Sequence, residues 1–81
     1  MNDGLADVDR RVVGTKQVLR ALAEGKVARA YVAQDADLLL TKRVVDRCYD
    51  MEIPCTQVES MEKLGRACGI DVKAAAAGLL K

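Results

Sequence analysis

The residues best suited to chemistry stand at the start of a helical stretch that runs between Gly14 and Gly25. Lys16, Gln17 and Arg20 fall on its polar side when residues are placed about 100° apart. The first backbone N–H groups of a helix have no partner, and the dipole makes that end positive. With cations beside it, such an end favours an anion such as phosphate. The stretch thus predicts an anion site, although the same pattern fits a helix whose polar side only faces water.

Groups for catalysis are scarce in this chain. It contains no His, so neither a Ser-His-Asp nor a Cys-His arrangement can form. Asp35 and Asp37 suit a turn and a helix cap better than an acid–base pair. No Walker-type loop or dinucleotide-binding glycine pattern is present. We therefore expect a protein that is not an enzyme and needs no cofactor.

Three cysteines, Cys48, Cys55 and Cys68, are scattered without any C-x-x-C pair. Because a structural zinc site takes four ligands, these thiols predict no metal. The simplest interpretation is three small core residues in a reducing compartment. A redox thiol is the alternative, although no activating His stands near any of them.

Length and composition favour one small cytoplasmic domain. The 81 residues predict a single domain over residues 1–81. Because 51% of the residues are apolar but only 2% are aromatic, the core must consist of small aliphatic side chains, as in helices packed on a sheet. No apolar run approaches the roughly 20 residues that cross a bilayer. Residues 1–4 lack the basic start and apolar core of a signal peptide.

Charge is unevenly distributed along the chain, although the net charge is only +1. Residues 10–29 hold six cations and one acid, whereas residues 30–62 hold three cations and seven acids. Segregated charge of this kind can steer an anionic partner to one face of a protein that is nearly neutral.

The elements that would position these groups alternate along the chain. Short strands are expected at residues 11–13, 28–33 and 55–58, and helices at residues 15–24, 38–50 and 61–68. Asp37 and Ser60 are placed to cap the second and third helices. The alanine-rich tail, residues 72–80, suits either a helix or a central strand under close-packed helices. The alternation predicts an α/β fold, a three-layer αβα sandwich.

The inner side of the second predicted helix can be read from its apolar spacing. Five residues recur at helical spacing and are expected to face the core: Leu40, Val44, Val45, Cys48 and Tyr49.

The sequence resembles the kink-turn-binding ribosomal protein family, the L-seven-Ae family, and is most similar to its short bacterial members. Four motifs carry the resemblance: residues 14–17 (GTKQ), 32–37 (VAQDAD), 53–54 (IP) and 60–70 (SMEKLGRACGI). The last is the most specific, and together the motifs cover nearly the whole chain.

The resemblance implies a fold and a function. The fold is an αβα sandwich around a four-stranded mixed sheet, in which the alanine-rich tail is the last strand. The function is noncatalytic binding of kink-turns, which are sharply bent RNA duplexes with tandem sheared G·A pairs beside a bulge. We accordingly expect a monomer that is associated with the ribosome and binds RNA, including ribosomal RNA.

The resemblance also implies the site. The start of helix 15–24 would meet the G·A pairs in the widened major groove, where Gly14 matches the glycine before the helix. Arg20 matches a lysine that contacts the RNA backbone. Asp37 and the loop of residues 59–61 match positions around the extruded bulge base. The implied RNA-binding residues are Gly14, Thr15, Lys16, Gln17, Arg20, Asp37, Glu59, Ser60 and Met61.

One dipeptide departs from the commoner family pattern, which has Asn-Glu where this chain has Lys16-Gln17. Lys16 can donate to guanine O6 or N7 as a flexible point charge. Gln17 can form hydrogen bonds but carries no charge. This departure, with the low net charge, motivates an alternative function: a protein-interaction module on the same fold with weak or lost RNA affinity.

Overall fold

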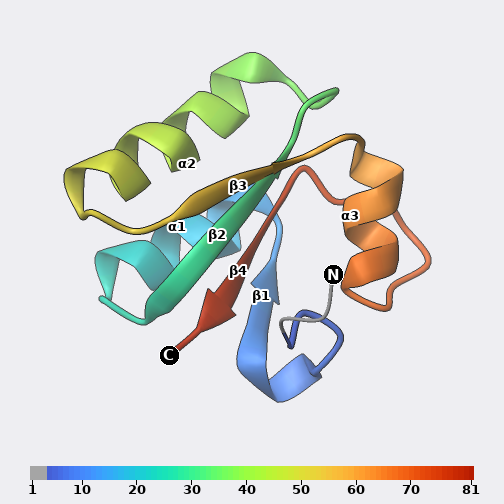
Figure 1. Cartoon of the computed structure of the whole chain (residues 1–81), viewed down its shortest axis with the longest axis horizontal. Coiled ribbons are helices and arrows are strands. Elements are labelled where there is room, and N and C mark those ends of the chain that lie inside the picture. Colours follow the sequence, from blue (N-terminus) through green and yellow to red (C-terminus); the bar gives the residue numbers. More distant parts are fainter. Residues whose placement is uncertain (1–3) are drawn as a thin grey trace.

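Four strands form a mixed sheet at the centre of the computed structural model, which describes residues 4–81 (Figure 1). The strands are β1 (Arg11–Val13), β2 (Val27–Ala33), β3 (Cys55–Val58) and β4 (Ala76–Leu80), in the order β1-β4-β2-β3. β2 pairs with β3 in parallel, and β4 lies antiparallel to both β1 and β2. The alanine-rich tail is therefore a central strand. Residues 1–3, on which the expectation of no signal peptide partly rests, lie outside the described residues.

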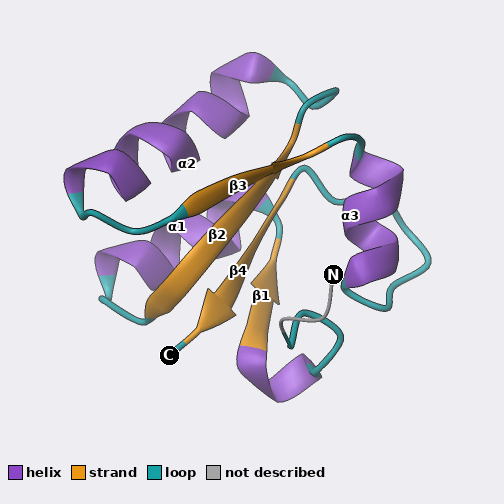
Figure 2. Cartoon of the chain, viewed as in Figure 1, coloured by secondary structure: helices purple, strands orange, loops and turns teal. Residues whose placement is uncertain are grey.

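Helices cover both faces of this sheet (Figure 2). They are α1 (Thr15–Ala23), α2 (Leu38–Asp50) and α3 (Met61–Ala67), and a 3₁₀ turn, η1 (Val8–Arg10), precedes β1. Alternate residues of β2 point to opposite faces. Ala30 and Val32 pack with α1 and α2, whereas Tyr31 and Ala33 pack with α3. The predicted three-layer α/β sandwich is thus confirmed.

β4 explains why the chain needs small residues near its end. Ala76 and Ala77 are fully buried in the two separate core clusters on either side of the sheet. A Cβ at the neighbouring Gly78 would lie 3.2 Å from Cγ2 of Val12. The small side chains let helices approach both faces of the central strand.

Both predicted helix caps are present. The Oδ1 atom of Asp37 accepts a hydrogen bond from the N–H of Leu39 at 2.8 Å, and the Oγ atom of Ser60 accepts one from the N–H of Lys63 at 3.1 Å. At the other end of α3, Gly69 has a φ of 74°, a conformation that favours glycine.

The predicted inner side of α2 is wrong at two positions. Thr41, Val44 and Cys48 are the buried residues of this helix, whereas Leu40 is 43% exposed and Tyr49 is 85% exposed. Thr41 is buried in place of Leu40. A buried Thr is tolerated here because its hydroxyl donates to the carbonyl oxygen of Asp37, the N-cap of α2, at 3.3 Å.

Among residues 4–81, no helix combines the length and apolarity that crossing a membrane requires.

Candidate nucleic-acid interface

One end of the sheet collects the predicted site residues. β1, β2 and β3 run in the same direction, so their carboxyl ends meet at one end of the sheet, where β4 begins. A helix follows each of these three strands, and α1, α2 and α3 all start at this end (Figure 1). In open α/β sheets this is where ligands bind. We call it the loop end.

Hydrogen bonds join the segments of the loop end to one another. The N–H of Gly14 donates to the carbonyl oxygen of Ala76 at 2.8 Å, which joins the start of α1 to β4. The N–H of Gln34 donates to the carbonyl oxygen of Val58 at 2.8 Å, and its side-chain amide donates to that of Gln57 at 3.0 Å. The loops after β2 and β3 are therefore held side by side.

The start of α1 leaves backbone donors available. Gly14 precedes the helix with φ 102° and ψ 144° and offers no capping side chain; this conformation is almost confined to glycine. Within residues 4–81, the N–H groups of Thr15, Lys16 and Gln17 have no hydrogen-bond partner. Thr15 is half-buried, and the side chains of Lys16 and Gln17 are exposed.

Arg20 extends the same surface by one turn. It is exposed, and neither it nor Lys16 makes an ion pair with any residue of the described chain. The start of α1 is therefore a positive helix end with free N–H donors and two cations whose charge is not neutralised.

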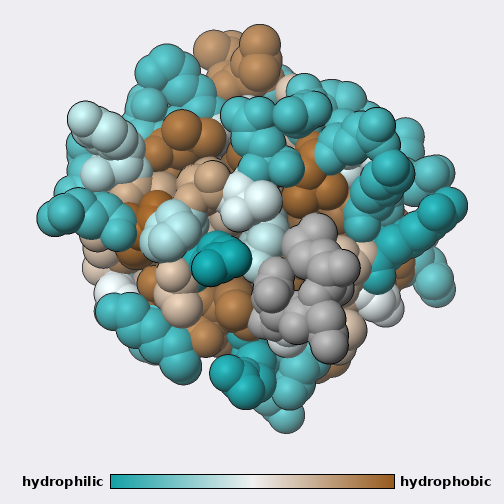
Figure 3. Space-filling model, in the orientation of Figure 1, coloured by the Kyte–Doolittle hydropathy of each residue, from teal (hydrophilic) through white to brown (hydrophobic). Residues whose placement is uncertain are grey.

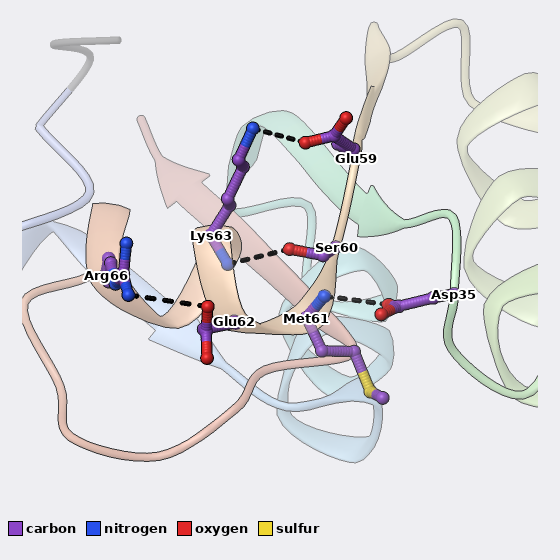
Figure 4. Close-up of polar contacts among 7 residues, drawn as sticks. All are labelled: Asp35, Glu59, Ser60, Met61, Glu62, Lys63 and Arg66. Carbon is purple, nitrogen blue, oxygen red and sulfur yellow. Dashed lines mark hydrogen bonds and ion pairs between the residues drawn. The ribbon is translucent and has the colours of Figure 1, made fainter.

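The second predicted group lies on the loops before α2 and α3. Asp37 is exposed but already accepts the capping hydrogen bond of α2. Two residues earlier, the Oδ1 atom of Asp35 accepts a hydrogen bond from the N–H of Met61 at 2.8 Å (Figure 4). The carbonyl oxygen of Met61 in turn accepts from the N–H of Ala74 at 3.1 Å. Asp35 thus fixes the loop of residues 59–61 beside the start of α2.

Glu59 and Ser60 both interact with one residue of α3. The carboxylate of Glu59 forms an ion pair with the ammonium of Lys63, and Ser60 caps the helix at the N–H of the same lysine (Figure 4). The negative charge that Glu59 brings to the loop is therefore balanced by a neighbouring cation. Met61 is half-buried and packs at the margin of the α3 core cluster.

Sequence reasoning missed two features of the loop end. Asp35 was assigned only to a turn, yet it joins two loops. Leu38 and Leu39 are 75% and 76% exposed at the first turn of α2, where Figure 3 shows hydrophobic surface at the upper margin. Three consecutive leucines directly after Asp37 could have signalled this, because successive residues of a helix cannot all face the core.

The cysteines are poor nucleophiles. Cys48 and Cys68 are buried, as expected for core residues, and Cys55 is half-buried. Burial raises the pKa of Cys48 to about 12, with a further contribution from the neighbouring Cys55 thiol. Burial also raises the pKa of Cys55 and Cys68.

In the part of the chain that the structure describes, no cluster of three or more His, Cys, Asp or Glu residues could hold a metal ion.

Comparison with known proteins gives a consistent result. Residues 4–81 match the model of the ribosomal protein L7Ae/L30e/S12e/Gadd45 family. An RNA-binding protein of Geobacillus thermodenitrificans is 50% identical over 70 residues, which are 86% of this chain and 85% of that protein. An RNA-binding protein of Bacillus pumilus is 38% identical over 78 residues, which are 96% and 95% of the two chains. The structure of the Giardia lamblia 15.5kD RNA binding protein superposes with a TM-score of 0.89 at 26% identity, over 98% of this chain and 67% of that one.

Proposed function

Since the chain belongs to the ribosomal protein L7Ae/L30e/S12e/Gadd45 family, we propose that it is a noncatalytic RNA-binding protein that recognises kink-turns. The start of α1 carries this proposal. There, free N–H donors and the unpaired cations Lys16 and Arg20 lie exposed at the loop end. Relatives that cover most of the chain are named RNA-binding proteins, which supports the partner class.

The start of α1 would hold the kinked stem. A regular A-form major groove is too narrow for a helix, so α1 can approach base edges only where a kink widens the groove. There Lys16 would donate to guanine O6 or N7, Gln17 would form a further hydrogen bond, and Arg20 would contact phosphate. The free N–H groups of Thr15, Lys16 and Gln17 add donors for the backbone of the same stem.

Asp37 and the loop of residues 59–61 would hold the extruded base. Asp35 keeps this loop against the start of α2, so the base would meet a surface formed before it binds. The ion pair of Glu59 with Lys63 lowers the repulsion that an unpaired carboxylate would exert on nearby phosphates. This pairing supports a place for Glu59 in an RNA interface.

The proposed mechanism is selection of one RNA conformation. A protein that binds the bent conformer more tightly than the extended one shifts the RNA equilibrium toward the bend. We propose that residues 1–81 act as one monomeric domain in the cytoplasm, in association with the ribosome. No catalytic step is part of this proposal.

Exposed leucines favour a second candidate, a protein-interaction module on the same fold. Leu38 and Leu39 present apolar surface beside Asp37, and the net charge is only +1. A module of this kind would bind RNA weakly, and its complex with a protein partner would persist after a nuclease has removed the RNA.

A fluorescence-energy-transfer titration tests the proposal directly. An RNA that contains one kink-turn carries a dye on each stem end, and magnesium is omitted so that the free RNA is mostly extended. Addition of the protein should raise the transfer efficiency to a plateau, because bound RNA is bent. An RNA in which the tandem G·A pairs are replaced by Watson–Crick pairs should show no change. A protein that leaves the transfer efficiency of both RNAs unchanged would favour the protein-interaction module.

A further inference from the structure

Two arginines of α2 are left without ionic partners. Arg43 and Arg47 are exposed, and neither pairs with an acid among residues 4–81. Their neighbour Lys42 differs, because its Nζ atom lies 2.7 Å from an oxygen of Asp46. Arg43 and Arg47 are four residues apart and therefore lie on the same side of the helix.

These arginines border a hollow between α1 and α2. Its lining residues are Leu19 from α1 and Arg43, Asp46, Arg47 and Asp50 from α2. The two helices lie side by side on the same face of the sheet and start at the same end of it (Figure 1). We call this hollow the α1–α2 groove.

One cation at the start of α1 lies on the groove side of that helix. Lys16 precedes Leu19 by three residues and therefore lies on the same side of α1. Cations therefore stand on both helices at this surface, with Lys16 on the Leu19 side of α1 and Arg43 and Arg47 bordering the groove on α2. Four helical residues rise about 6 Å, a distance that suits contacts to successive phosphates of one strand.

Acidic residues divide the groove into a positive and a mixed part. Asp46 is neutralised by Lys42. Asp50 has no ionic partner in the described chain and ends α2, far from the start of α1. The field is therefore more positive toward the start of α1 than at the end of α2.

We propose that the α1–α2 groove is a second RNA contact, in which Arg43 and Arg47 hold the phosphate backbone of a stem that leaves the kink. This inference rests on the proposed function, because the same RNA occupies both surfaces. The contact reads no sequence; it orients the stem and adds affinity. Arginine suits this role because its guanidinium can bind phosphate through two hydrogen bonds.

A charge-removal experiment tests the groove. The double variant Arg43→Gln/Arg47→Gln is titrated with a kink-turn RNA that has long stems, over a series of salt concentrations. Each lost phosphate contact should reduce the slope of log K against log salt by about 0.7 to 0.9, so the double variant should lose about 1.4 to 1.8. The matched control is Arg10→Gln/Arg29→Gln, which removes the same charge from exposed residues at the opposite end of the sheet and should change the slope little.

Two further arms separate a phosphate contact from a general charge effect. Asp50→Asn should tighten binding at low salt, because it removes the free carboxylate that lines the groove. With a kink-turn whose stems are trimmed close to the kink, the double variant and the wild type should bind alike. Circular dichroism melting checks that all variants are folded.

The outcomes distinguish this inference from the proposed function. If the wild type binds the kink-turn but the double variant keeps its salt slope, the groove contact is wrong and the proposed function stands. A slope that falls equally in the Arg10/Arg29 control also overturns it. If the wild type does not prefer the kink-turn, the proposed function fails and the groove contact fails with it.

Discussion

At the start of α1, backbone and side chains supply different parts of one interaction. The helix fixes the direction of the N–H groups of Thr15, Lys16 and Gln17. Gly14, which precedes the helix, has a backbone conformation that most other residues avoid. The cations of Lys16 and Arg20 are exposed. We therefore expect the backbone to orient RNA and the cations to supply most of the salt-dependent affinity.

Removal of either cation tests this division at the residue scale. Lys16→Ala and Arg20→Ala should each weaken binding to a kink-turn RNA and reduce the slope of log K against log salt by about one. The measurement is a calorimetric titration at several salt concentrations. The control is Arg29→Ala, which removes an exposed arginine near the start of β2, away from the loop end. This variant should keep the slope. Variants that lose affinity with unchanged slopes would argue against phosphate contacts.

Cys48 predicts a pH dependence of stability. Its pKa is raised by burial to about 12, whereas an exposed thiol titrates near 9.0. Above about pH 9 the unfolded chain releases this proton while the folded protein retains it, so the unfolded state binds fewer protons. The free energy of unfolding should therefore fall as the pH rises from 9 toward 12, and be unaffected by this thiol below pH 8.

Urea unfolding of wild type and Cys48→Val at pH 8, 9 and 10 measures this effect. The difference between the two proteins separates the effect of this thiol from every effect of pH that both proteins share. Valine fills a similar volume and cannot ionise. The wild type should lose more stability than the variant between pH 8 and 10. Equal losses would mean that Cys48 titrates normally in the folded protein.

At the scale of elements, the hydrogen bond between Asp35 and Met61 adds to those of Gln34 in joining the loops before α2 and α3. Asp35→Ala removes the acceptor of the Met61 N–H and should lower the free energy of unfolding by about 1 kcal/mol. It should also weaken kink-turn binding, because the loop of residues 59–61 loses its fixed position. Asp35→Asn keeps an acceptor oxygen and should retain most of both properties. Urea unfolding and an RNA titration measure the two effects, and equal binding by Asp35→Ala would remove this loop from the proposed site.

Local signals made the helices predictable. The bounds of α2 agree with the prediction because Asp37 caps it through its own side chain, an interaction within three residues. Ser60 likewise fixes the predicted start of α3, although the helix ends at Ala67, one residue before its predicted end. The inner side of α2 was mispredicted because Tyr49 and the three leucines after Asp37 widen its apolar band. Only the packing against the sheet decides which part of that band is buried.

Contacts between distant segments could not be predicted. The hydrogen bond of Asp35 to Met61 spans 26 residues. Leu19, Arg43 and Arg47 line one groove only because α1 and α2 pack side by side. Composition also left the tail ambiguous, since alanine favours helix in isolation. Its pairing with two other strands in the sheet makes β4 a strand.

At the scale of the whole molecule, topology and ion pairing together produce an asymmetric surface. Three strands deliver their following loops to one end. On α3 both cations are paired with acids, whereas Lys16, Arg20, Arg43 and Arg47 on the other face are not, within residues 4–81. A net charge of +1 therefore coexists with a positive face that can attract RNA.

The most direct test of the central claim compares the affinity for two RNAs at one salt concentration. One RNA contains a kink-turn, and the other is an unbent duplex of matched length in which the bulge is removed and the G·A pairs are replaced. The protein should bind the kink-turn at least tenfold more tightly, a difference of about 1.4 kcal/mol, because only that RNA offers a widened groove and an extruded base. Equal affinity for the two RNAs would contradict the account.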